Sequence, residues 1–160
     1  MVTWIDLVDE EEQAAITQFS GEYYFLSNFY PSTVELEGQI YSTVEHAYQA
    51  AKTKDKKERI EIQRAFYPAE AKRLGRAATI RSNWDDVKLD VMRYLLEQKF
   101  AFGRIECVKL CNTLNTELVE GNTWGDTYWG VCDGEGANHL GKLLMEIRED
   151  RLSHSIYSDS

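Results

Sequence analysis

Apolar residues in the second half of the chain recur every three or four positions, which is the spacing of one helix face. In residues 84–102 the recurring residues are Val87, Val91, Leu95 and Phe102. After Asn138 they are Leu140, Leu143, Leu144 and Ile147. This spacing predicts a long helix over 84–102 with Asn83 as its cap, and a last helix with Asn138 as its cap.

Capping residues and a proline divide the middle of the chain into shorter helices. Ser42 or Thr43 can cap a helix that runs to about Lys54, and a second helix is expected over 55–66. Pro68 suits the first turn of a third helix, because the N–H group that proline lacks would have no partner there. A further helix is expected over 104–114.

Short apolar runs predict strands. Residues 33–36 and 39–41 form a pair that turns at Glu37 and Gly38, and residues 23–26, 117–120 and 128–132 have the same character. The acidic run 9–12 is expected to open a short helix, and residues 153–160 to form a frayed tail. These elements predict an α+β fold: a mainly helical single domain over 1–160, with its core at about 19–150, around a small antiparallel or mixed sheet.

The composition is that of a folded chain outside the membrane. The 160 residues are 43% hydrophobic, and no stretch approaches the roughly 20 uncharged residues of a membrane span. The first residues do not have the pattern of a secretory leader. Three cysteines without a CxxC pair favour a reducing compartment, so we expect a cytoplasmic location. Cys107 and Cys111 fall short of the ligand set of a structural zinc site and are expected in the core.

The charge is unevenly spread along the chain. The net charge is −9, which opposes nonspecific attraction to a nucleic-acid backbone. Residues 51–81 nevertheless hold ten basic and four acidic side chains. A basic helical region on an acidic body favours a phosphate-bearing small molecule over a long duplex. For residues 54–59, an ordinary solvated helix face is an equally good interpretation.

The most informative polar pattern lies in residues 42–52. Four polar residues stand there at positions i, i+3, i+4 and i+7: Glu45, Tyr48, Gln49 and Lys52. On a helix they share one face, which brings a carboxylate and an amine together. A structural interpretation is also open, because Ser42 and Glu45 could form a capping box and Lys52 could be an ordinary exposed lysine. His46 is expected to pack or to hydrogen-bond locally.

Three further clusters carry groups suited to a sugar and an aromatic base. Ser27 and Asn28 offer hydroxyl and amide groups, or simply close a turn. In residues 120–130, aromatic side chains surround Asp126 between glycines, either as a base-binding site or as an aromatic core corner in which Asp126 caps a turn. The backbone amides of residues 134–141 could hold an anion at the start of the last helix.

Taken together, these segments resemble the NADAR (YbiA-like) superfamily. The resemblance runs from about Phe19 to Arg148 and rests on several motifs in the same order. These are GEYYFLSNFYP, TVEHAYQAAK, the Asn83–Trp84 pair leading into Val91–Met92 and Lys99–Phe100, LVEGNTWGDTYWG, and GANHLGKLLMEIR. Each motif alone is weak evidence, but their common order makes chance similarity improbable.

The resemblance implies an N-glycosidase that needs no cofactor. Family members of one branch split ribosylamino-pyrimidine phosphate intermediates of riboflavin synthesis, and others remove ADP-ribose from guanine bases in nucleic acid. Both substrates join the ribose anomeric carbon to an exocyclic amine. Such a linkage can open to an imine, so that a lysine holds the sugar as a Schiff base, or it can break directly through an oxocarbenium-like state.

On this resemblance we assign roles to particular residues. Glu45 is expected to shuttle protons with Asp126 as its partner carboxylate, and Lys52 to be the nucleophile with Lys99 in reserve. The residues expected to contact the base, sugar or phosphate are Ser27, Asn28, Tyr48, Trp84, Lys99, Trp124, Trp129 and Asn138. A module that binds ADP-ribose or another nucleotide without cleaving it is the main alternative, and a protein interaction domain with an aromatic core is a third possibility.

Overall fold

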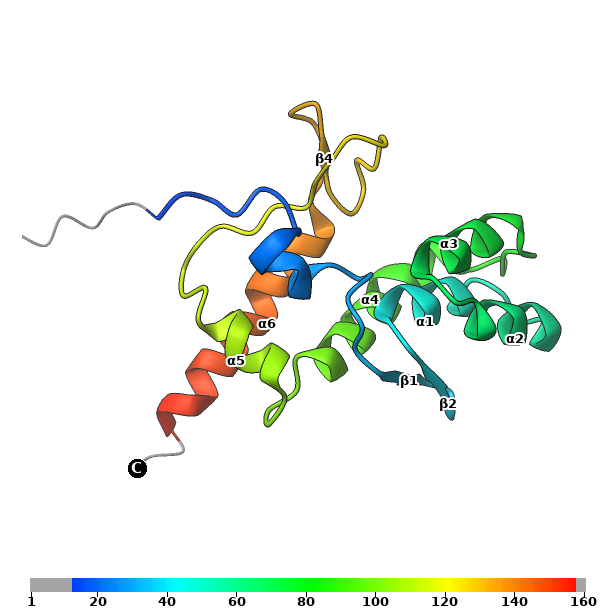
Figure 1. Cartoon of the computed structure of the whole chain (residues 1–160), viewed down its shortest axis with the longest axis horizontal. Coiled ribbons are helices and arrows are strands. Elements are labelled where there is room, and N and C mark those ends of the chain that lie inside the picture. Colours follow the sequence, from blue (N-terminus) through cyan, green and yellow to red (C-terminus); the bar gives the residue numbers. More distant parts are fainter. Residues whose placement is uncertain (1–12, 158–160) are drawn as a thin grey trace, which may run out of the picture.

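Helices make up most of the structure, a computed structural model that describes residues 13–157 (Figure 1). The helices are the 3₁₀ helix η2 (Gly21–Leu26), α1 (Val44–Ala51), α2 (Lys56–Arg64), α3 (Pro68–Ala77), α4 (Trp84–Lys99), α5 (Ile105–Cys111) and α6 (His139–Tyr157). The strands are β1 (Val34–Leu36), β2 (Gln39–Tyr41), β3 (Gly121–Asn122) and β4 (Val131–Cys132). The predicted α+β class is therefore confirmed. The helix expected to open at residues 9–12 lies outside the described residues.

Three helix starts follow from the local sequence. Thr43, one of the two predicted caps, accepts a hydrogen bond from the N–H of His46 at 3.1 Å and begins α1. Asp55 accepts from the second and third residues of α2, and Pro68 occupies the first turn of α3. Helix α1 ends at Ala51, three residues earlier than predicted.

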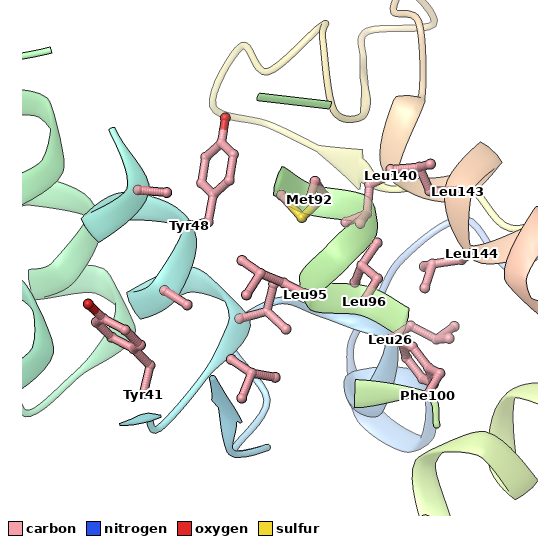
Figure 2. Packing of buried hydrophobic residues seen from close by; sticks show 14 of the residues in the cluster. Leu26, Tyr41, Tyr48, Met92, Leu95, Leu96, Phe100, Leu140, Leu143 and Leu144 are labelled. Atoms are coloured by element: carbon pink, nitrogen blue, oxygen red, sulfur yellow. The ribbon is translucent and has the colours of Figure 1, made fainter. Parts of the chain in front are cut away.

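Helix α4 forms the centre of the core. Its Leu95 and Leu96, with Phe100 just after it, are fully buried among leucines from η2 and α6 (Figure 2). Burying each such side chain contributes roughly 1.5–3 kcal/mol, so this cluster fixes α4 against α1 and α6. The helix ends at Lys99, before the left-handed Gly103. Phe102 lies beyond the helix and is 57% exposed, so its assignment to the apolar face is wrong.

The predicted hairpin is confirmed. Strands β1 and β2 pair antiparallel, with Val34 opposite Tyr41, and turn at Glu37 and Gly38. Both turn residues have positive φ, of 50° and 82°, as a two-residue hairpin turn requires.

The strand predicted at residues 23–26 is wrong, because this segment is part of η2. Two features account for the helical turn. Gly21 has a φ of 60°, which bends the chain at the start of the segment, and the neighbouring Phe25 and Leu26 are both buried. Adjacent residues of a strand point to opposite faces, so a strand on the surface of this core would expose one of them.

The predicted strands in the second half are shorter than expected. Strands β3 and β4 pair in parallel over two residues each, and Leu118 makes only an isolated bridge with Ile16. Residues 117–120 and 128–130 are irregular, because side chains bond to the backbone there. The frayed tail predicted at 153–160 is also wrong for its first part, since α6 continues to Tyr157.

Asn138 precedes α6, as predicted, but its side chain does not cap that helix. It donates to the carbonyl of Leu118 at 3.0 Å and accepts from the N–H of Glu120 at 3.1 Å. Its φ of 52° lies in the left-handed region, which asparagine tolerates better than most residues. Asn138 therefore ties the start of α6 to the irregular segment before β3.

Candidate active site

One cavity of about 710 Å³ lies between α1 and the irregular segment around β3 and β4. Its size is within the usual range for a small-molecule site. The predicted site residues that line it are Ser27, Asn28, Glu45, Tyr48, Lys52, Trp124, Asp126 and Trp129. Tyr48 from α1 and Met92 from α4, both labelled in Figure 2, are part of its wall.

The polar face of α1 supplies one wall of the cavity. Because Thr43 and not Ser42 caps the helix, Glu45 takes no part in a capping box, and the structural alternative for this residue is wrong. Glu45 instead accepts a hydrogen bond from the Gln49 amide at 2.7 Å, and its own N–H donates to the carbonyl of Asn28 at 3.1 Å. Burial raises the pKa of the Glu45 carboxyl, although the Gln49 bond and the charges of Lys72 and Lys52 lower it.

Gln49 reaches Glu45 because the two residues stand one turn apart on α1, and α3 passes close to the same amide. A Cβ atom at Gly75 would lie 1.9 Å from Oε1 of Gln49, so a larger residue at this position of α3 would have to displace the Gln49 amide. The same contact leaves Oε1 of Gln49 buried without a hydrogen-bond partner. The absence of a side chain at Gly75 therefore leaves room for the amide that bonds to Glu45.

Lys52 stands at the end of α1, with its Nζ atom 5.5 Å from the centre of the Tyr48 ring. Burial lowers the pKa of Lys52, and the nearby positive charges of Lys72, Arg76 and Lys88 lower it further, while Glu45 raises it. A lysine with a lowered pKa is more often neutral, and the neutral amine is the nucleophile.

Asp126 is held by the loop that carries it. Its Oδ1 atom accepts from the N–H groups of Tyr128 and Trp129 at 3.1 and 2.9 Å, so it closes a turn. Asn122 clamps the same loop through both of its amide atoms. The turn brings the Trp129 ring edge-on to the Tyr48 ring, and the indole N–H donates to the Tyr48 hydroxyl at 3.1 Å. The structure thus combines the two interpretations of this cluster, a capped turn and a cavity wall.

Three residues predicted for the site do not line the cavity. Trp84 is buried and packs against Tyr48, with 5.1 Å between the ring centres. Lys99 is fully buried and donates to the carbonyl of Ser27 at 2.7 Å. Burial lowers the pKa of Lys99 to about 7. Asn138 holds the segment before β3, as described above. All three support cavity residues from behind.

Other residues of the cavity were not predicted as site residues. Glu120 lines it opposite α1, and burial raises the pKa of this carboxyl to about 8, helped by the charges of Asp126 and Glu45. Lys72 reaches it from α3, with Nζ 5.4 Å from the centre of the Trp124 ring. The sequence feature that could have indicated Glu120 as a site residue is its place directly after the apolar pair Leu118–Val119.

His46 lies off this face and bonds locally, as predicted. Its Nδ1 atom is 2.7 Å from the Thr43 hydroxyl, and its Nε2 atom is 2.9 Å from the carbonyl of Ala65. Since a carbonyl only accepts, Nε2 carries the proton.

Within residues 13–157 no three His, Cys, Asp or Glu side chains are grouped so that they could hold a metal ion. In the same part of the chain, no helix has the length and apolar character needed to cross a membrane.

The chain matches known proteins over most of its length. Residues 15–152 match the NADAR domain. N-glycosidase YbiA of Shigella flexneri is 42% identical over 133 residues, which cover 81% of this chain and 82% of that protein. A riboflavin biosynthesis protein of Vibrio vulnificus is 36% identical over 84% of this chain but only 37% of its own length. The NMR structure of Escherichia coli YbiA is similar, with a TM-score of 0.79 and 37% identity over 91% of this chain and 89% of that one.

Proposed function

Because this chain belongs to the NADAR family, we propose that it hydrolyses the bond between the anomeric carbon of a ribose and an exocyclic amine of a heterocyclic base. The observation that carries this proposal is the convergence of Glu45, Lys52 and Asp126 on one cavity beside aromatic rings. A carboxyl group and an amine with perturbed pKa values in such a cavity are suited to proton transfer and nucleophilic attack.

Lys52 is the proposed nucleophile. The sugar ring opens when the glycosidic nitrogen forms a C=N bond to the anomeric carbon and the ring oxygen leaves and takes a proton. The neutral Lys52 amine then adds to that carbon. The base departs as a free amine, whose nitrogen carries one proton more than it did in the substrate. Water adds to the resulting lysine imine and releases the sugar as an aldehyde, which regenerates the Lys52 amine.

Glu45 is the proposed proton carrier next to this lysine. It lies about two turns before Lys52 on the same helix face. Burial raises the pKa of its carboxyl group, which favours the protonated form that a proton donor needs. Asp126 is the proposed partner carboxylate, which also keeps Trp129 against Tyr48. Trp124 and Trp129 offer ring faces for the base, and Ser27 and Asn28 offer polar groups for the sugar.

Ribosylamino-pyrimidine 5-phosphates are the substrates that we favour. Two observations support them over ADP-ribosylated guanine in nucleic acid. The net charge of −9 opposes a long polyanion, and one relative is named a riboflavin biosynthesis protein. Lys72 at the cavity offers a cation for a single phosphate group.

A direct comparison of substrates tests the proposal. The purified protein is incubated in parallel with a ribosylamino-pyrimidine 5-phosphate and with ADP-ribosylated guanine DNA, and released base and sugar are measured by mass. We expect release from the pyrimidine substrate. Release only from the DNA would show that ADP-ribosylated guanine is the substrate. Binding of ADP-ribose without release from either compound would support a non-catalytic binding module.

A further inference from the structure

We propose that Glu120 is a second catalytic carboxyl, which gives the departing base its proton. This inference rests on the proposed function and concerns a residue opposite α1 in the same cavity. It follows from how the Glu120 backbone is held, from the surroundings of its carboxyl group, and from the proton balance of the reaction.

The backbone of Glu120 is fixed on both sides. Its N–H donates to the Asn138 side chain at 3.1 Å, and its carbonyl accepts from the N–H of Val131 at 2.9 Å. A Cβ atom at Gly130 would lie 2.1 Å from that carbonyl oxygen, so the two segments touch there. The constrained backbone fixes the point from which the Glu120 side chain enters the cavity.

The carboxyl group of Glu120 lines the cavity, and its Oε2 atom is buried without a hydrogen-bond partner in the structure. The charged groups that act on it come from three sides: Glu45 on α1, Asp126 on the loop and Lys72 on α3. Burial is the main reason that the pKa of Glu120 is raised to about 8; Asp126 and Glu45 raise it further, and Lys72 lowers it. Near neutral pH it therefore carries a proton that no neighbour accepts.

The other two carboxyl groups of the cavity are engaged differently. Glu45 accepts the Gln49 amide at 2.7 Å and faces the cations of Lys52 and Lys72. Asp126 accepts two backbone N–H groups, a role that needs acceptor oxygens. Glu120 is thus the acid with a free position for a donated hydrogen bond.

The reaction needs one such group. The exocyclic nitrogen leaves as an amine, so it gains one proton as its bond to the anomeric carbon breaks. Water that adds to the same carbon loses one proton, which can return to the carboxylate of Glu120. This balance is the same whether the sugar passes through a lysine imine or is displaced directly, so the role of Glu120 does not depend on which route operates.

The pH profile of Glu120→Gln tests the inference, with Glu117→Gln as the matched control because Glu117 is exposed on the same segment. A general acid must be protonated, so wild-type kcat/KM should fall as the pH rises through about 8. The Glu120→Gln variant should lose about a hundredfold or more of this activity and should lack that alkaline decline. The Glu117→Gln variant should keep both the rate and the profile.

Each result has a separate meaning. A Glu120→Gln variant with the wild-type rate and profile overturns the role of Glu120, whereas a wild-type protein that releases base from neither substrate overturns the proposed function itself. Should the variant not fold, the wild-type protein decides: carbon-13 NMR of the glutamate carboxyl groups should show Glu120 titrating near pH 8. Titration near 4.5 would overturn the inference.

Discussion

The two walls of the cavity are built by different means. On α1, regular helix spacing places Glu45, Tyr48 and Lys52 on one face, and the helix backbone needs no help from their side chains. On the opposite wall, Glu120 and Asp126 sit on irregular backbone that Asn122 and Asn138 hold through individual hydrogen bonds. A single substitution should therefore remove one group from the helical wall but displace several groups on the other.

The largest effect is expected on the helical wall from Lys52→Met. This change removes the proposed nucleophile and leaves a side chain of similar length, so turnover should fall at least about a thousandfold while the fold is kept. Steady-state release of base, together with circular dichroism, measures both. Lys54→Met is the control, because Lys54 is exposed two residues further on, and it should keep wild-type turnover. Equal activity of the two variants would remove Lys52 from the mechanism.

On the irregular wall, Asn138→Ala should affect both stability and activity. It removes the hydrogen bonds to Leu118 and Glu120 and places alanine at a φ of 52°, so we expect a loss of about 2 kcal/mol in the free energy of unfolding. Displacement of Glu120 should also lower kcat by roughly tenfold to a hundredfold.

Urea unfolding and steady-state kinetics check this pair of effects. Asn115→Ala, at an exposed position in the irregular segment before β3, should change neither the free energy of unfolding nor kcat. If Asn138→Ala lowers stability yet keeps full kcat, the irregular wall tolerates displacement, and the contrast between the two walls fails.

The free energy of unfolding should depend on pH through Glu120, which belongs to the irregular wall. The pKa of Glu120 is about 8 in the folded protein against an ordinary 4.5, so the unfolded chain releases this proton first as the pH rises. The contribution of Glu120 is therefore fully present below about 4.5 and is lost as the pH rises through 8. At pH 8, Glu120→Gln should be more stable than wild type by on the order of 1–3 kcal/mol, and at pH 4 the two should be nearly equal.

Thermal unfolding at several pH values measures this difference. Glu117→Gln should follow the wild-type curve throughout. A constant gap between Glu120→Gln and wild type from pH 4 to pH 8 would show that Glu120 titrates normally.

The smallest effect is expected from Trp124, at the exposed edge of the cavity. Trp124 is 62% exposed and contacts Lys72 through its ring face, an interaction worth roughly 0.5–1 kcal/mol at such a site. Trp124→Ala should therefore raise KM a few-fold and leave kcat and the melting temperature unchanged. A loss in kcat instead would place Trp124 closer to the reacting bond than its exposure indicates.

The sequence predicts the helical wall better than the irregular one, for physical reasons. Periodicity alone places Glu45 and Lys52 on one face, and Thr43, one of the two predicted caps, locates the start of α1. No periodic pattern describes Glu120, whose position depends on a bond to Asn138, 18 residues away. The same holds for the Gly75–Gln49 contact, which exists only because α3 packs against α1.

Lys99 shows a further limit of sequence reasoning. Its residue type and its motif fit a reserve nucleophile, but its amine is fully buried against the carbonyl of Ser27 behind the cavity. Lys52 and Lys99 both lie in α-helical segments or directly after them, and only the tertiary packing distinguishes an amine that lines the cavity from one that supports it.

Trapping of the sugar on the protein tests the central claim most directly. The wild-type protein is incubated with a ribosylamino-pyrimidine 5-phosphate in the presence of borohydride, which reduces a lysine imine to a stable amine, and peptides are mapped by mass. We predict one reduced pentose phosphate adduct, on Lys52. Continued release of base with no adduct on Lys52, or with the adduct on Lys99 or another lysine, would contradict the account.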